Sequence, residues 1–566
     1  MDNHGAAHVL EQIAAYLELK GESEFRVRAF RNAAHAIEDF SGDVAVAATT
    51  GELGELKGVG PATLEVVREW TTTGHSSALD SLKREVPPGL VELLRIPGLG
   101  VAKVRILHRQ LAVTSIGDLE VAARDGRVAK LPRFGAKTAE RILRGIDFLH
   151  RTGDLHLYHH ARRRAEQLRT AIAALPGVTR VVIAGSLRRA CEVIRDVDVA
   201  VAATLAPADL ADLLGHVAGV RDVAVTGAGA LSADLGDRLT ADIYVAPPGR
   251  FGALLLRATG NTAHVEALAA AARARGLDWE HAPFAEEADL FAALGMAWVP
   301  PELREGQGEL ERAAAGTLPR LIERADLQGL IHCHTVDSDG TSTVSELAEA
   351  CRAAGYRYVG ITDHSVAAAF AGGLTAEVIA RQHAAIDAFN RTSRDLRVLK
   401  GIEADILPDG TLDYTPEFLD RFDFVIGSIH ARYDLDERAQ TARMLKAMED
   451  PRVAIIGHPT GRLLLEREPY RIDMAAVIRA AADRGVAIEI NADPLRLDLD
   501  WRLCPAARDA GVPIPIGADA HSLAGLANVD VGVGIARKAG LTRGDVLNAR
   551  DVEGFLEHVE HRKHAR

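Results

Sequence analysis

The chain has 566 residues, of which 48% are hydrophobic and 26% charged, and its formal net charge is −13. This length indicates about three or four domains, and the composition is that of a soluble globular protein. The start shows no basic region followed by an apolar run, and no stretch is apolar enough to span a bilayer, so we expect no secretory leader and no membrane partner. The four cysteines are scattered, which argues against a disulfide framework and a cysteine-rich zinc site and favours a reducing cytoplasm.

The acidic balance argues against a nucleic-acid partner, but its distribution weakens that argument. Acidic residues are in excess mainly beyond residue 325, whereas the first 150 residues are nearly balanced. Basic faces can therefore exist in the first part of the chain. Net charge bears on partners and solubility rather than on the fold.

Residues 8–150 are predicted to be mostly helical, with glycine-containing turns between the helices. Three segments of related shape, 56–62, 96–102 and 131–137, each precede a helical stretch. A Gly-x-Gly turn that opens a helix leaves backbone N–H groups free at the positive end of the helix dipole, where they can bind phosphate without reading sequence. One such turn is more simply an ordinary tight turn, but repeated copies are stronger evidence.

The repeated turns resemble the helix-hairpin-helix motifs of DNA-binding proteins. In the third copy Arg133 replaces the first glycine, so a phosphate contact is expected mainly from the first two copies. The glycines predicted to contact DNA are Gly58, Gly60, Gly98 and Gly100.

From about residue 178 the pattern changes to strands. Asp196 and Asp198 are two positions apart on the second strand, so both carboxylates face the same way. With Asp242 on the third strand, they could hold divalent metals that clamp nucleotide phosphates. Asp-x-Asp is common on exposed strands, but this strand is otherwise apolar, so unpaired carboxylates would be costly there. The predicted elements are strands at 178–184, 197–203 and 239–245, helices over 251–275, an ordered loop at 298–305 and a helix near 308–325.

Between residues 329 and 522, one predicted strand after another ends in a residue that can bind metal. Alternation of strands with helices gives about seven βα units and predicts a parallel barrel. Such a barrel gathers the C-terminal ends of its strands on one face, so the side chains there are expected to meet. His332 and His334 alternate around Cys333, which is expected to point into the core. The candidate ligands are His332, His334, Asp339, His364, Glu403, His430, His458, Asp519 and His521.

Chance clusters are a real alternative in a chain with 22 histidines, but chance does not explain their placement at successive strand ends. Imidazole with carboxylate and no thiolate suits Zn²⁺, Mn²⁺ or Fe. Nine ligands could hold about three metals.

The segment 185–189, Gly-Ser-Leu-Arg-Arg, followed by Asp196-Val197-Asp198, resembles the nucleotidyltransferase palm of family X DNA polymerases. The turn 259–261 resembles the Thr-Gly-Ser turn of that family, and 291–295 with 300–305 resembles the end of its bacterial thumb. The resemblance implies catalytic aspartates that bind Mg²⁺ or Mn²⁺: Asp196, Asp198 and Asp242. It implies nucleotide contacts from Gly185, Ser186, Arg189 and Gly260.

The nine strand-end residues resemble the ligand set of the polymerase-and-histidinol-phosphatase (PHP) domain. The resemblance implies that a metal-bound water attacks phosphorus, and that Asp363 and Glu489 support the ligands or have structural roles. It implies three ligand sets, namely His332, His334, Glu403 and Asp519 for one metal; Asp339, His364 and His521 for a second; and Glu403, His430 and His458 for a third.

Three positions depart from the family X pattern. Arg257-Ala258 stands where the family has Tyr-Phe, at the place where the sugar is checked, and Arg195 stands where glycine is frequent. The lyase lysine of the animal repair enzymes is replaced by Val66, so no Schiff-base chemistry is expected there.

The resemblance covers nearly the whole chain and predicts a multidomain protein: an α-helical helix-hairpin-helix region, an α+β nucleotidyltransferase palm and thumb, and a distorted (β/α)7 PHP barrel. We expect a monomeric cytoplasmic enzyme of base-excision or gap repair that uses deoxynucleoside triphosphates and gapped or nicked DNA. Its barrel would be a 3′–5′ exonuclease and an abasic-site endonuclease. The expected domains are 1–90 and 91–150 (helical, DNA-binding), 151–250 (palm), 251–318 (thumb) and 326–566 (PHP).

Two alternatives remain at this point. One is a small-molecule phosphoesterase whose first half is an accessory, and the hairpin repeats argue against it. The other is a DNA-binding scaffold with a decayed polymerase site. The departures at Arg257-Ala258 and Arg195 favour this second alternative, whereas the three aspartates argue against it.

Overall fold

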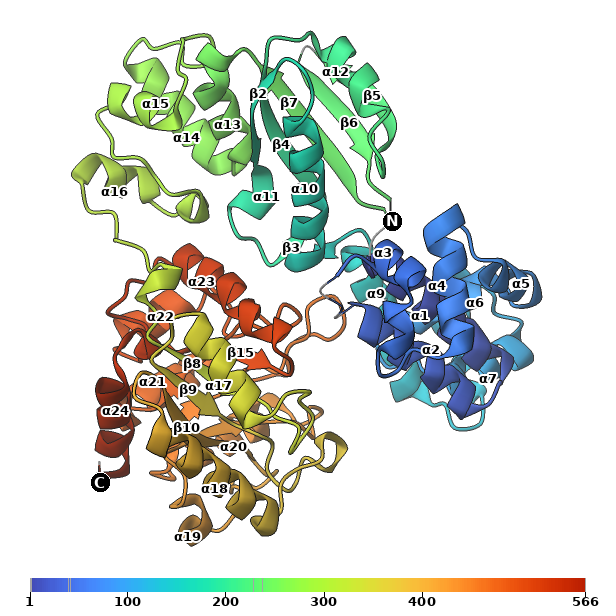
Figure 1. The fold of residues 1–566 in the computed structure, drawn as a ribbon, viewed down its shortest axis with the longest axis vertical. Coiled ribbons are helices and arrows are strands. Elements are labelled where there is room, and N and C mark those ends of the chain that lie inside the picture. The colour runs from blue at the N-terminus through green and yellow to red at the C-terminus, as the bar shows by residue number, and fades with distance from the viewer. Residues whose placement is uncertain (1–2, 39, 41, 228, 237, 565–566) are drawn as a thin grey trace. The chain divides into compact units, whose positions relative to one another are not determined.

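The computed structural model describes residues 3–38, 40, 42–227, 229–236 and 238–564. The chain divides into two compact units, Met1–Asp154 and Leu155–Arg566. The first is helical, and the second holds a five-stranded sheet and a barrel (Figure 1). Among the described residues, no helix has the length and apolar character needed to cross a membrane.

The first unit is a bundle of helices around one apolar core, as predicted. Buried leucines and isoleucines such as Leu10, Ile13 and Leu107 are contributed by helices far apart in sequence. Val66 packs in this core and is 6% exposed, so that position is structural. The α-helices described in this unit are α1 (Asn3–Lys20), α2 (Glu24–Glu38), α3 (Val44–Thr50), α4 (Pro61–Thr73), α5 (Ser77–Glu85), α6 (Pro88–Leu94), α7 (Val101–Leu111), α8 (Ile116–Arg124) and α9 (Ala136–Thr152).

The three predicted hairpin turns open α4, α7 and α9, with glycines at the N-caps of all three helices. In the first two turns the first glycine has a left-handed backbone, with φ of 102° at Gly58 and 77° at Gly98. Arg133 takes the same conformation, with φ of 67°. The third turn therefore keeps the backbone shape of the first two, although an arginine is strained there.

In the second unit, the five-stranded sheet has the order β2-β4-β7-β6-β5, and its two central strands β4 and β7 run parallel. Odd-numbered residues of β4 pack against α10 and α12, and even-numbered residues pack against α13. This alternation places Asp196 and Asp198 on the α13 side. The elements are α10 (Tyr158–Ala173), β2 (Val178–Ile183), α11 (Gly185–Arg188), β4 (Asp196–Ala203), α12 (Pro207–Leu214), β5 (Arg221–Gly227), β6 (Ala230–Asp234), β7 (Thr240–Ala246) and α13 (Phe251–Thr259).

Two expectations about this part of the chain were incomplete. Strands β5 and β6 were not predicted. Strand β5 is almost wholly exposed and has no apolar alternation, and β6 is only five residues long. The helix expected near 308–325 is shorter: α16 (Glu309–Ala315) ends at Gly316, whose left-handed backbone stops the helix. The other elements between the sheet and the barrel are α14 (Thr262–Ala274), α15 (Glu287–Ala293), the 3-10 helix η4 (Pro301–Leu303) and the 3-10 helix η5 (Arg324–Asp326).

The last part forms the predicted parallel barrel, with helices around it (Figure 1). Only Glu489 separates β13 from β14, and β13 pairs with β12 while β14 pairs with β15. The two short strands thus act as one broken strand that closes a ring of seven. The strands are β8 (Gly329–Cys333), β9 (Tyr358–Ile361), β10 (Arg397–Asp405), β11 (Phe424–Ser428), β12 (Val453–Ile456), β13 (Ala487–Ile488), β14 (Ile490–Asn491) and β15 (Ile516–Ala520). The helices are α17 (Val344–Ala353), α18 (Ala376–Thr392), α19 (Pro416–Leu419), α20 (Glu437–Ala447), α21 (Met474–Arg484), α22 (Cys504–Asp509), α23 (Asn528–Lys538) and α24 (Val552–His564).

Candidate active sites in the barrel and the central sheet

The nine candidate ligands of the barrel come together at one end of its strands. Glu403 lies at the centre, with its carboxylate oxygens 2.9 to 3.3 Å from nitrogens of His332, His364, His430 and His458. Four groups have ligand atoms within 4.8 Å of one another: His334, Asp339, His364 and His521; His332, Glu403 and His458; His332, His334 and Asp519; and His364, Glu403 and His430.

These groups agree with the three expected ligand sets in part. The second set is found together, joined by His334. His430 and His458 fall into different groups, although both contain Glu403. Cys333 lies in the hydrophobic core, 0% exposed, as the alternation predicted.

The backbone at three of these residues is left-handed. The φ angles are 60° at His332, 25° at His458 and 47° at Asp519. The strand pairings of β8 and β15 also shift register beside His332 and Asp519. Strained backbone of this kind persists only where the surrounding fold enforces it, and it clusters at functional sites.

The charges of the cluster strongly perturb its titration. Burial alone would raise the pKa of Glu403, but His430, His332 and His364 hold it well below the ordinary range. Burial opposes protonation of His364, yet Glu403 and Asp339 raise its pKa to about 10. Burial, together with the charge of His521, lowers the pKa of His334 to about 4. The cluster therefore contains one imidazole whose pKa is raised, His364, and one whose pKa is lowered, His334.

The donor set fits divalent metal ions. Several buried ligand atoms make no well-directed hydrogen bond, although some lie close to an oppositely charged group: Nε2 of His332, both ring nitrogens of His334, Oε2 of Glu403 and Nδ1 of His458. Burying polar atoms without partners is costly. Metal coordination would satisfy those that face the cluster.

A layer of polar side chains orients the ligands from behind, which is typical of metal sites. Glu489, the residue between β13 and β14, accepts from His332 Nδ1 at 2.6 Å. Asp405 hydrogen-bonds Nδ1 of His430, and the amide of Asn491 donates to Asp519 at 2.9 Å. Glu489 was considered from the sequence. Asp405 was missed, although its position two residues after Glu403 on the same strand was a signal.

Asp363 holds the loop that follows β8. It accepts from the backbone N–H and the hydroxyl of Thr335, both at 2.7 Å, and from Gln382 at 2.6 Å. This supports the structural role that the sequence left open for Asp363.

The three aspartates of the central sheet lie on adjacent strands. Asp198 on β4 pairs in register with Asp242 on β7, and Asp196 precedes it on the same face. The hydroxyl of Tyr244 donates to Asp198 Oδ1 at 3.3 Å. Burial, followed by the charges of Asp196 and Asp242, raises the pKa of Asp198 to about 7. This clustering of acids creates the negative field that divalent cations neutralise.

The raised pKa of Asp198 predicts a pH-dependent demand for metal. Below about pH 7 a metal ion must displace the proton of this carboxyl, so affinity falls as pH falls. We expect the Mg²⁺ concentration that half-saturates nucleotide incorporation to rise about fivefold from pH 7 to pH 6. Titrating Mg²⁺ at about pH 6, 7 and 8 measures this concentration. Equal half-saturating concentrations at pH 6 and 7 would contradict the assignment of Asp198 as a metal ligand.

Two features require glycine at position 185, where the Gly-Ser turn begins. Its φ is 59°, and a Cβ at this position would overlap the Asp198 carboxylate. Gly185→Ala should therefore displace Asp198 and reduce metal-dependent incorporation by about 5- to 150-fold, since strain of this kind costs about 1–3 kcal/mol. Gly227→Ala on β5 is the matched control, because an added Cβ there meets no atom of the described residues beyond its chain neighbours within 4 Å. Equal activity of the two variants would refute this reading.

The expected nucleotide contacts lie near one another. Arg189 donates to the carbonyl of Thr259, and a Cβ at Gly260 would lie 3.1 Å from its guanidinium. Ser186 belongs to the short helix α11 with Gly185. The structure thus brings Arg189 to the 259–261 turn, which contains Gly260, another expected nucleotide contact.

A buried ion-pair network beneath this turn was not found from the sequence. Glu287 accepts bidentate hydrogen bonds from Arg188 and from Arg304, at 2.7 to 3.0 Å. Burial opposes ionisation of Glu287, but the two arginines hold its pKa at about 2. The network ties the 185–189 turn to the 298–305 loop, and its members are too far apart in sequence to be paired by spacing.

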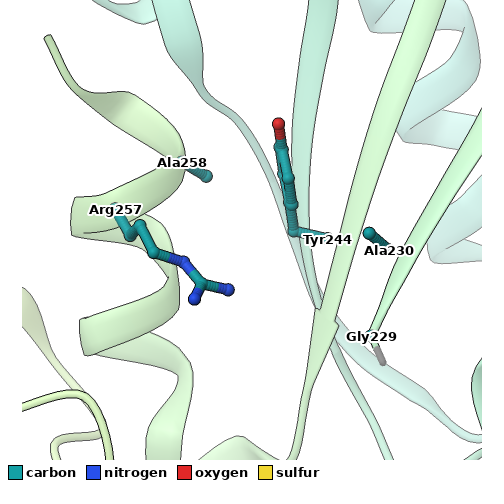
Figure 2. A pocket seen from close by; sticks show the side chains of 5 residues that line it. All are labelled: Gly229, Ala230, Tyr244, Arg257 and Ala258. Atoms are coloured by element: carbon teal, nitrogen blue, oxygen red, sulfur yellow. The ribbon is translucent and has the colours of Figure 1, made fainter. Parts of the chain in front are cut away.

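Arg257 and Ala258, which depart from the family X pattern, line a cavity of about 430 Å³ (Figure 2). Both residues are on α13, and they face Tyr244 across the cavity, with Gly229 and Ala230 completing the lining. Since Tyr244 hydrogen-bonds Asp198, Arg257 and Ala258 lie close to the candidate polymerase site. Arg195 is exposed and precedes Asp196.

Family models match four stretches of the chain. A helix-hairpin-helix domain matches residues 1–76, and a SAM-like helix-hairpin-helix tandem matches residues 90–147. A DNA polymerase beta thumb matches residues 254–305, and a PHP domain matches residues 331–493. The order of these domains is the order expected from the resemblance.

Individual relatives differ in how much of the chain they match. Two probable phosphatases match 243 residues, or 41%, of this chain, and the match covers 94% of each of them. The chain is 28% identical to the one from Thermoanaerobacter sp. (strain X514) and 29% identical to the one from Shewanella sediminis (strain HAW-EB3). It is 36% identical over 565 residues to the DNA polymerase/3'-5' exonuclease PolX of Bacillus subtilis (strain 168), covering 97% of this chain and 98% of that protein. Because this last match spans nearly all of both chains, the chain belongs to the family X DNA polymerases with a C-terminal PHP domain.

Proposed function

We propose that this chain fills short gaps in DNA by adding deoxynucleotides, and that its barrel removes nucleotides from 3′ ends. One observation carries the proposal: a three-aspartate sheet and a barrel with nine clustered ligands occur in a chain that aligns end to end with a DNA polymerase/3'-5' exonuclease. Gap repair or base-excision repair by a monomer in the cytoplasm suits this pair of activities.

In the palm, Asp196, Asp198 and Asp242 would hold Mg²⁺ or Mn²⁺, which neutralise the phosphates of a nucleotide when bound. Arg189, with Ser186 and the backbone of the 259–261 turn, would bind the triphosphate. The rest of this domain would keep these side chains in fixed positions. The Glu287 network and the close approach of Gly185 to Asp198 hold these groups in fixed positions, which favours reaction by orienting the reactants.

In the barrel, the nine ligands would hold about three divalent ions of zinc, manganese or iron. Bound ions would supply positive charge at a phosphate and would lower the pKa of a water molecule towards about 7. Asp339 and His521 have side chains 33% and 38% exposed, whereas the side chains of the other seven ligands are at most 8% exposed. The DNA end would therefore enter on the side of these two residues. Cleavage at abasic sites is a further reaction of the same kind.

The helical unit would hold DNA through the turns at Gly58, Gly60, Gly98 and Gly100. The rival function, a small-molecule phosphoesterase, is weaker because the probable phosphatases align with less than half of the chain. A binding titration with gapped duplex over a salt series separates the two. We expect the logarithm of the affinity to fall linearly with the logarithm of the salt concentration, as phosphate contacts require. No binding to DNA, together with turnover of small phosphate monoesters, would favour the rival.

A further inference from the structure

The guanidinium of Arg189 is not free in this structure. It donates through Nε to Glu305 Oε1 at 3.1 Å and through Nη1 to the carbonyl of Thr259. The other oxygen of Glu305 accepts from Asn261 Nδ2 at 3.1 Å. Glu305 thus joins the triphosphate-binding arginine to the 259–261 turn, and it competes with a triphosphate for the charge of that arginine.

A second cation shares Glu305, and it comes from the barrel. Lys538, the last residue of α23, is 4% exposed. Its Nζ donates to the same Oε1 of Glu305 and, at 2.9 Å, to the carbonyl of Arg189. The ammonium also lies 4.7 Å from the centre of the Trp501 ring, which favours a cation in this place. A buried lysine with these partners is held at one position.

The barrel also contacts the neighbouring part of the same turn. Glu192 is buried and binds Arg462 at 2.9 Å and Arg502 at 3.2 Å. A Cβ at Gly534 on α23 would lie 3.4 Å from the Cβ of Ala190, so the helix and the turn are in close contact. The segment that carries Arg189 is therefore fixed by residues of the PHP domain.

We propose that Lys538 of the PHP domain is a positioning residue of the polymerase site, which acts through Glu305 on Arg189. This rests on the proposed role of Arg189 in binding the triphosphate. With both cations present, the charges of Lys538, Arg189 and Glu305 add to +1; without Lys538 they add to zero. Glu305 then pairs with Arg189 alone, and the arginine attracts a triphosphate less strongly. The barrel thus supports nucleotide binding at a site to which it contributes no metal ligand.

The test is steady-state gap filling by the full-length protein with Lys538→Met, and with Lys538→Gln in case the first variant folds poorly. We expect the KM for the deoxynucleoside triphosphate to rise about tenfold, with kcat changed less than about twofold. Exonuclease activity of the same preparations should match the parent, because the described contacts of Lys538 are with Arg189, Glu305 and Trp501, which are not barrel ligands.

Arg537→Met is the matched control. Arg537 is the neighbouring residue on α23 and binds Glu302 at 2.7 Å across the same contact, whereas the described hydrogen bonds of the Arg189 side chain go to Glu305, Thr259 and Cys191. An equal rise in KM in this variant would mean that the domains merely dock there, and it would overturn the proposal. So would an unchanged KM in both Lys538 variants.

A double-mutant cycle tests the route through Glu305. In a Glu305→Gln background, Lys538→Met should change KM by less than about twofold, whereas a full tenfold change would contradict the route. Absence of gap filling in the parent would count against the proposed polymerase itself. An active parent with an unchanged KM in the variants would count against Lys538 only.

Discussion

His334→Ala is expected to abolish the removal of 3′ nucleotides while gap filling survives. His334 is fully buried and belongs to two of the four ligand groups, so its loss should disrupt more than one metal position. Metal ions contribute several kcal/mol to phosphate hydrolysis, so we expect a decrease of at least about a thousandfold. The measurement is shortening of a 5′-labelled strand with Mn²⁺ present and no nucleotides.

The control for this variant is His561→Ala, which removes an exposed histidine from α24 of the same barrel. It should degrade the strand at the parental rate. Parental degradation by His334→Ala would remove the barrel as the nuclease site, and loss of gap filling in the same variant would show that the substitution harms the whole fold.

Asp198→Ala is expected to have the complementary effect, with incorporation lost and degradation retained. Asp198 is the central carboxylate of the three, facing Asp242 in register and lying two residues from Asp196. Without it, the two remaining aspartates lie on different strands and cannot share a metal through the carboxylate between them. Because metal ions stabilise the charge that develops on the transferred phosphate, we expect incorporation to fall at least about a thousandfold.

Single-nucleotide extension across a gap, with Mg²⁺ or Mn²⁺, measures this loss. Asp209→Ala on α12 is the control, since it removes an exposed carboxylate of the same domain. Incorporation by Asp198→Ala at the rate of Asp209→Ala would show that the palm assignment is wrong.

The parts of the fold that follow periodic patterns were predictable. Alternation along β4 placed Asp196 and Asp198 on one face, and that face packs against α13. The regular succession of strands and helices predicted the barrel and the meeting of its strand ends. Strand β5 could not be predicted, because an exposed edge strand lacks the apolar alternation by which strands are recognised.

The sites were predictable where chemistry follows local spacing, and less so where it depends on the backbone or on distant pairs. Nothing in the sequence indicates that His332, His458 and Asp519 have left-handed backbones. The pairing of Glu287 with Arg188 and Arg304 joins residues up to 99 positions apart. Lys538 is 349 positions from Arg189, which it contacts. Such contacts arise from tertiary packing, which spacing along the chain does not encode.

The most direct test of the whole account is one assay on a gapped duplex, supplied with divalent metal and deoxynucleotides, that follows extension and degradation of the same labelled strand. The parent is expected to do both, His334→Ala only to extend, and Asp198→Ala only to degrade. Loss of both reactions from a single one of these substitutions, with the protein still folded, would contradict two separate active sites in one chain.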